Sequence, residues 1–157
     1  MPNLSPIQQD ALRQVLEEYE NQYDPNERML SSEAYKVGYH TTVRGGAMHP
    51  TRESLAYAVA LLDSGNAESL ERAAGILRRV ASLQDQDPQS KTYGIWSWYL
   101  EEPLEKMSPP DWNWADFCGV QLLAAYRDYR DRLPTDLSDI LGQSIVHAAR
   151  SIERRNV

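Results

Sequence analysis

The pattern of apolar and polar positions along the chain predicts five helices. The first helix begins after Ser5, because residues 5–8 (SPIQ) form a capping box with proline at the first helical position. Apolar residues then recur at helical spacing on one face as far as about Tyr23. Residues 67–84 and 135–154 show the same two-faced pattern. We therefore expect these three helices to cover the outside of the fold.

Two further predicted helices are apolar on nearly every side. One spans residues 51–64 and contains the run LAYAVALL. The other begins at Asp111 or Asn113 and contains the run ADFCGVQLLAAY. A helix without a polar face is usually buried all round. These two helices should therefore be the most buried segments and should form an inner layer.

Long and short connections alternate between the predicted helices. Roughly 25 residues precede the second helix and roughly 28 precede the fourth, whereas residues 65–66 and 133–135 are short turns. The middle of the first long connection, residues 35–50, can form a short pair of extended strands. The predicted fold class is all-α. It is a single domain over residues 1–157, built from antiparallel helical hairpins in inner and outer layers.

The composition limits the classes of partner. The chain has 157 residues, enough for one domain with a core, and 41% of them are hydrophobic. A net charge of -7 and a pI near 4.9 argue against binding to nucleic acid or to an anionic membrane. The longest apolar run, residues 55–62, is too short to span a bilayer. We therefore expect no nucleic-acid partner and no membrane partner.

The sequence also argues against a metal or a cofactor. The single cysteine, Cys118, permits no intrachain disulfide and no cysteine-based zinc site, and its apolar helix places it in the core. Asp111, Asn113 and Asp116 resemble part of a calcium loop, but the required glycine is missing. The first ten residues have neither a basic start nor an apolar run, so we expect a cytoplasmic location unless a secretion signal has been removed.

Residues 92–117 contain the most distinctive chemistry. All four tryptophans, Trp96, Trp98, Trp112 and Trp114, lie here among acidic residues. Indole faces beside carboxylates suit a polar ring such as a sugar. Because residues two apart share one face of an extended chain, each of the two pairs is a candidate sugar platform. The alternative is that these side chains pin a long loop to the core.

The acidic residues of the same stretch are the candidate catalytic groups. Glycoside hydrolysis uses two carboxylates about 5–10 Å apart. We select Glu102 and Asp111 as this pair, with Glu101 and Asp116 as further candidates. The alternative for Asp111 and Asp116 is that they cap the fourth helix.

The first long connection supplies basic side chains, which are His40, Arg44, His49 and Arg52. Arg44 and His49 are assigned to substrate binding, because a guanidinium and an imidazole can hold the carboxylate of a uronate sugar, as lyase chemistry would require. The alternative is local hydrogen bonding within the loop, with His49 as a helix cap.

Several motifs resemble a known architecture. Gln89 followed by residues 94–96 (GIW) resembles the Q…GxW pattern of (α/α) toroid repeats. The stretches YHTTVRGGAMHPTRESLAYAVALLDSG, TYGIWSWYLEEPLEKMSPPDWNWADFCGVQLL and SIERRNV resemble an uncharacterised bacterial family with this six-hairpin architecture, which many glycosidases and polysaccharide lyases share. The resemblance implies that the chain is the N-terminal portion of a larger toroid, since five helices cannot close such a ring.

The resemblance implies a carbohydrate-active protein, similar to a glycoside hydrolase or a polysaccharide lyase, with an oligosaccharide or polysaccharide as its partner. Two alternatives are a non-catalytic carbohydrate-binding module and a helical protein-interaction domain. An incomplete ring would also leave an apolar edge beside the first or fifth helix, through which the chain would self-associate.

The most specific expectation concerns the two long connections. One short-turned hairpin separates them, so residues 40–49 and 96–114 should lie together at one end of the bundle. The ligand-facing residues there should be Trp98, Glu102, Asp111 and Trp112, with Arg44 and His49 opposite.

Overall fold

The computed structural model describes residues 4–33 and 38–155, and it is predominantly α-helical, as predicted. The five α-helices of the described residues are α1 (Pro6–Glu20), α2 (Thr51–Ser64), α3 (Ala67–Ala81), α4 (Trp114–Tyr129) and α5 (Thr135–Arg155). The remaining regular elements are the antiparallel strands β1 (Tyr23–Asp24) and β2 (Met29–Leu30) and the 3₁₀ turns η1 (Leu104–Lys106) and η2 (Arg130–Arg132).

The small sheet lies before the segment in which we expected an extended pair. Within residues 38–50, Met48 forms an isolated antiparallel bridge with Ser32 and Pro50 forms one with Tyr99; residues 34–37 lie outside the described residues.

Local sequence signals set several helix boundaries. The capping box of α1 is confirmed, because the Ser5 hydroxyl accepts from the Gln8 amide and the Gln8 side chain accepts from the Ser5 amide. Asn66 caps α3 by accepting from the Ser69 amide at 2.8 Å. Between these helices Gly65 has φ +79°, a left-handed conformation that ends α2.

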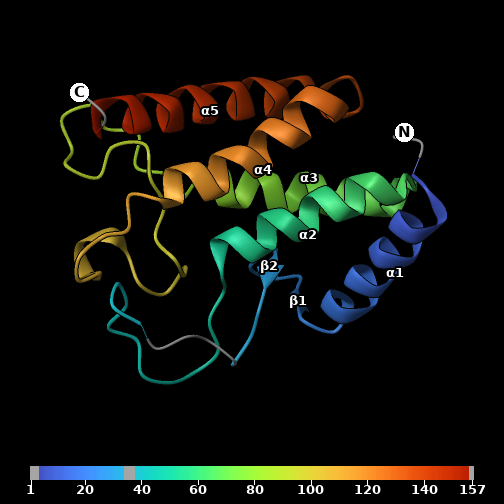
Figure 1. The fold of residues 1–157 in the computed structure, drawn as a ribbon, viewed down its shortest axis with the longest axis horizontal. Helices are drawn as coiled ribbons and strands as arrows, with labels where there is room; N and C mark the ends of the chain where they lie inside the picture. Colours follow the sequence, from blue (N-terminus) through green and yellow to red (C-terminus); the bar gives the residue numbers. More distant parts are fainter. Residues whose placement is uncertain (1–3, 34–37, 156–157) are drawn as a thin grey trace.

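Two helical hairpins form the body of the molecule. The hairpin of α2 and α3 packs beside the hairpin of α4 and α5, with α2 against α4 and α3 against α5 (Figure 1). The prediction that α2 is buried is confirmed, since Leu55, Tyr57, Ala58 and Leu62 are at most 1% exposed. No helix in the described part of the chain is long and apolar enough to cross a membrane.

The expectation that α4 is buried all round is wrong. Cys118 and Leu122 face the core, but Phe117, Val120 and Leu123 are 42%, 62% and 45% exposed. Residues three apart lie on one side of a helix, so these three side chains form a single apolar stripe. Arg52 of α2 lies over the Phe117 ring, while Val120 and Leu123 remain exposed.

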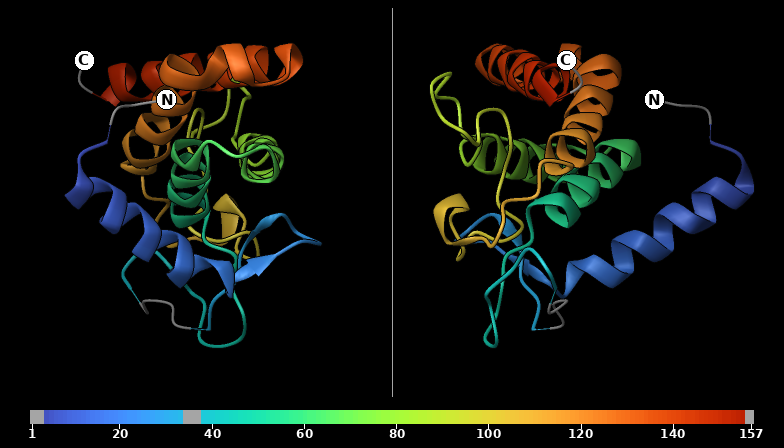
Figure 2. Two further views of the ribbon diagram at one scale, coloured as in Figure 1. Left: turned by 90° about the vertical axis from the view of Figure 1, so that its right-hand side faces the viewer. Right: turned by 60° about the vertical axis from the view of Figure 1, so that its left-hand side comes forward.

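Helix α1 is more exposed than its two-faced pattern suggests. None of its residues is buried, and Ile7 is 83% exposed. Leu16 and Tyr19, near its C-terminal end, pack against the core beside α2. Its N-terminal turns extend away from the hairpins (Figure 2). An apolar face therefore continues along α1 beyond the part that packs.

The two long connections meet at one end of the bundle, as predicted. The Thr51 amide donates to the Trp98 carbonyl and the Leu100 amide donates to the His49 carbonyl, each at 3.0 Å. These bonds flank an isolated bridge between Pro50 and Tyr99. The chain therefore brings the tryptophan-rich stretch onto the start of α2.

Candidate functional site

A pocket of about 540 Å³ opens where α1, the N-terminal turns of α2 and α4, and the tryptophan-rich stretch come together. Its aromatic wall consists of Tyr19, Trp98, Tyr99, Trp114 and Phe117. Its charged side chains are those of Glu18, Arg52, Glu53 and Asp111. A pocket of this size that combines aromatic walls with a few charged groups is typical of small-molecule and saccharide sites.

Two stacked indoles form the centre of the wall. The rings of Trp98 and Trp114 lie 5.0 Å apart at an interplanar angle of 28°, and Phe117 meets Trp114 edge-on. Trp114 Nε1 donates to Thr51 Oγ1 at 2.9 Å, and Trp98 Nε1 donates to Asp111 Oδ2 at 3.2 Å. Because both indole N–H groups are bonded, the rings are held in place before any ligand arrives.

Of the two predicted catalytic acids, only Asp111 lines the pocket. Its second oxygen, Oδ1, accepts from the Asn113 amide at 3.0 Å just before α4. Glu102 instead turns toward the first long connection, where its Oε1 accepts from the amide and the hydroxyl of Thr42 at 2.6 Å each. Glu102 is buried and outside the pocket. The predicted pairing of Glu102 with Asp111 in one ligand site is therefore wrong.

The four tryptophans separate into different roles. Trp96 is fully buried and donates from Nε1 to the Val80 carbonyl at 2.8 Å, so the expectation that it faces a ligand is wrong. The shared-face argument fails because the chain bends at Trp98, after the turn at residues 91–94. Trp112 is half-buried and does not line the pocket, and its Nε1 donates to the Lys91 carbonyl at 3.4 Å.

Arg44 makes the local hydrogen bonds of the alternative interpretation, whereas the His49 ring bonds Asp24 and Glu101. The Arg44 guanidinium donates to the carbonyls of Thr41 and Val43 within its own loop. Neither Arg44 nor His49 lines the pocket. The predicted position of these two side chains opposite the tryptophans, facing the same ligand, is therefore wrong.

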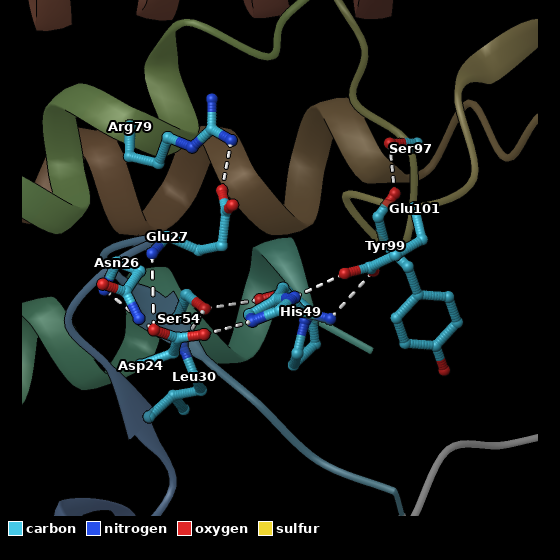
Figure 3. Close-up of polar contacts among 11 residues, drawn as sticks. Asp24, Asn26, Glu27, Leu30, His49, Ser54, Arg79, Ser97, Tyr99 and Glu101 are labelled. Carbon is cyan, nitrogen blue, oxygen red and sulfur yellow. Dashed lines mark hydrogen bonds and ion pairs between the residues drawn. The ribbon is translucent and has the colours of Figure 1, made fainter. Parts of the chain in front are cut away.

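His49 links the hairpin of β1 and β2 to the tryptophan-rich stretch. Its ring lies between two carboxylates, with Nε2 3.2 Å from Asp24 Oδ2 and Nδ1 hydrogen-bonded to Glu101 Oε1 (Figure 3). Its backbone amide donates to the other Glu101 oxygen at 3.0 Å. The residue at the N-cap of α2 is Pro50, so His49 does not cap the helix. In the described residues, no three His, Cys, Asp or Glu side chains are grouped to hold a metal.

The two carboxylates control the protonation of His49. Partial burial lowers the pKa of the ring, but the hydrogen bonds and charges of Glu101 and Asp24 outweigh burial and raise the pKa above 6.5. A base with a raised pKa in the folded state stabilises the fold below its unfolded pKa. That contribution is lost as the pH rises through the folded pKa.

Replacing His49→Gln should remove this pH dependence. In the unmodified chain, the free energy of unfolding should fall by about 1 kcal/mol or less as the pH rises from about 6.5 through the raised pKa, because the ion pairs are partly exposed. Urea denaturation across this range measures the change. His40→Gln is the control, since the His40 ring bonds the Pro109 carbonyl, 2.7 Å away, instead of a carboxylate. If the free energy of unfolding of His49→Gln still falls with pH as steeply as in the unmodified chain, another group is responsible for the titration.

The sequence pattern missed five of the aromatic and charged residues that line the pocket, namely Glu18, Tyr19, Glu53, Tyr99 and Phe117. Glu53 lies in the first turn of α2, and Phe117 lies in the first turn of α4. Both helix starts were expected at the end of the bundle where the long connections meet. Their first-turn side chains were therefore identifiable, whereas the approach of α1 depends on tertiary packing.

Comparison with known proteins gives one match. The model of a family described as a domain of unknown function, DUF8769, matches residues 9–157. Neither the curated proteins nor the solved structures gave a significant match.

Proposed function

The chain belongs to the DUF8769 family, and we propose that it is a carbohydrate-active protein of the (α/α) toroid type that binds a saccharide in the aromatic pocket. The observation that carries the proposal is the fixed stack of Trp98 and Trp114 beside the Asp111 carboxylate. Flat indole faces pack against the apolar C–H faces of sugar rings, and carboxylates accept hydrogen bonds from sugar hydroxyls.

The arrangement of the hairpins supports the toroid part of the proposal. Neighbouring hairpins of an (α/α) toroid place equivalent helices side by side in an inner and an outer layer. Here α2 lies against α4, and α3 lies against α5. The short turns lie at one end of the hairpins and the long connections at the other (Figure 1).

The pocket also suggests which groups would act in catalysis. Hydrolysis of a glycosidic bond needs two carboxylates about 5–10 Å apart, on either side of the bond. Since Glu102 lies outside the pocket, we assign these roles to Asp111 and Glu53. A lyase would need a cation to hold a uronate; Arg44 and His49 are engaged elsewhere, and Arg52, the one cation that lines the pocket, lies over the Phe117 ring among three carboxylates. Hydrolysis is therefore the better-supported of the two chemistries.

Trp98→Ala and Phe117→Ala should each weaken saccharide binding by roughly 1–3 kcal/mol, taking the stacking of bases on aromatic side chains as an analogue. Each change removes one part of the aromatic wall. Calorimetric titration with a panel of oligosaccharides measures the effect. Trp112→Ala is the matched control, because this indole lies in the same stretch but outside the pocket. Equal weakening in all three variants, or in none, would contradict the assignment of the pocket.

The exposed stripe on α4 favours a second function, a helical interaction domain that self-associates. Phe117, Val120 and Leu123 present apolar surface to solvent, and covering it in a second copy would remove that surface from water. Val120→Glu should shift the chain toward monomer in sedimentation velocity. Val146→Glu on α5 is the control, since Val146 is similarly exposed on a different helix. A wild-type chain that sediments as a monomer at high concentration would rule out this function.

A further inference from the structure

The pocket has an excess of negative charge. It contains three carboxylates, Glu18, Glu53 and Asp111, and a single guanidinium, Arg52, which leaves a net charge of minus two. None of the ion pairs within the described residues involves Glu18, Glu53 or Arg52. The negative charge is therefore not cancelled by pairing elsewhere on the protein.

The pKa of Tyr19, on the pocket wall, reflects this excess of negative charge. Burial raises the pKa of Tyr19, and the nearby Glu18 and Glu53 carboxylates raise it further. Arg52 lowers the pKa, but its influence is smaller than that of either carboxylate. Where Tyr19 meets the pocket, the potential of the acids therefore exceeds that of the one cation.

The aromatic wall suits a cation as well as a sugar ring. The Arg52 guanidinium already lies over the Phe117 ring, 4.8 Å from its centroid. An ammonium group gains energy from an aromatic face in the same way, and most from tryptophan. The stacked Trp98 and Trp114 rings lie beside Asp111, so one small region offers both an aromatic wall and a carboxylate.

The positive ends of the helices that begin at the pocket do not reverse its preference for a cation. Helices α2 and α4 both begin there, and each N-terminus is equivalent to about half a positive charge, which favours an anion. Glu53 lies in the first turn of α2, and Asp111 accepts from the amide of Asn113 directly before α4. The protein's own carboxylates therefore already occupy the favourable anionic positions at both helix starts.

We infer that the pocket selects saccharides that carry a protonated amine, such as oligomers of 2-amino-2-deoxy sugars, over neutral or uronic saccharides. The inference rests on the proposed function, because it names the class of sugar that the same pocket takes. The ammonium would lie between the carboxylates and the indoles, while the sugar ring packs on the aromatic wall.

Three oligosaccharides of equal length test the inference by calorimetric titration of the full chain at low salt. They are a glucosamine oligomer, its fully N-acetylated counterpart and a galacturonic acid oligomer. The amine-bearing oligomer should bind about 5- to 30-fold more tightly than the acetylated one, the range that an ammonium–aromatic contact provides. The uronic oligomer should bind most weakly, because the pocket repels its carboxylates.

Two variants show whether the pocket acids cause the preference. Glu53→Gln should reduce the preference for the amine over its acetylated counterpart by several-fold. Glu17→Gln is the control, since Glu17 also lies near the pocket end of α1 but does not line the pocket. Retention of the full preference in Glu53→Gln would overturn the role of the acids.

The outcomes separate this inference from the proposed function. Equal binding of the amine and acetylated oligomers, or tighter binding of the uronic oligomer, would overturn the inference and leave saccharide binding intact. Binding of none of the three would overturn the proposed function and the inference with it.

Discussion

Trp96→Ala should lower the free energy of unfolding by about 3–5 kcal/mol, the usual cost of emptying a large aromatic site in a core. The Trp96 side chain is fully buried, and its Nε1 donates to the Val80 carbonyl near the end of α3. The change therefore leaves a cavity and removes the indole hydrogen bond to the Val80 carbonyl, which keeps its bond from the Leu83 amide. Urea denaturation followed by circular dichroism measures the loss.

Trp112→Ala is the comparison for Trp96→Ala. Trp112 is half-buried and its hydrogen bond to Lys91 is long, at 3.4 Å, so we expect a cost of about 1–2 kcal/mol. If both variants unfold at the same denaturant concentration, Trp96 does not anchor the tryptophan-rich stretch to the core in the way that the structure indicates.

Gly94→Ala should also be strongly destabilising, by about 2–5 kcal/mol, because two costs add. Gly94 has φ +83°, a conformation that costs an L-residue about 1–2 kcal/mol. A β-carbon at this position would also collide with the His147 carbonyl and come within 2.7 Å of Ser151 Cβ, both on α5. Only glycine lets this turn lie directly against the helix. Thermal and urea denaturation measure the combined cost.

Gly46→Ala separates the two costs. Gly46 also has a positive φ, +97°, but an added β-carbon there meets only Met48 Cε, at an ordinary contact distance of 3.7 Å. This variant should therefore show the conformational cost alone, about 1–2 kcal/mol. Equal losses in the two variants would mean that the close approach of Gly94 to α5 contributes nothing.

The sequence predicts the helical framework well because the signals involved are local. The capping box at Ser5, the cap at Asn66 and the left-handed Gly65 all act within a few residues of their own position. The meeting of the two long connections also follows from the sequence, since it depends only on the number of helices between them. The bonds that join His49 and Thr51 to the tryptophan-rich stretch confirm it.

Burial on α4 could not be predicted in this way. An apolar side chain predicts burial only if another element covers it, and local composition does not show which elements are neighbours. Leu122 and Leu123 are adjacent and chemically identical, yet one is fully buried and the other is 45% exposed. The same reasoning explains why Ile7 on α1 is exposed despite its place in a regular apolar stripe.

The candidate site was predicted in part. Trp98, Trp114 and Asp111 were selected from the sequence and line one pocket. Trp96 could not be distinguished from Trp98, because the burial of Trp96 and its bond to Val80 of α3 depend on a contact between separate elements. The prediction that Glu102 faces the ligand also failed because of a contact between distant residues. Its carboxylate accepts hydrogen bonds from Thr42 of the other long connection.

The four indole N–H groups offer the most direct test that a saccharide binds in this pocket. Each gives one signal in a nitrogen–proton correlation spectrum, and four single Trp→Phe variants assign them. On titration with an oligosaccharide that binds, the signals of Trp98 and Trp114 should move, while those of Trp96 and Trp112 stay in place. Saturating oligosaccharide that moves no indole signal, or that moves only the signal of Trp112, would contradict the account.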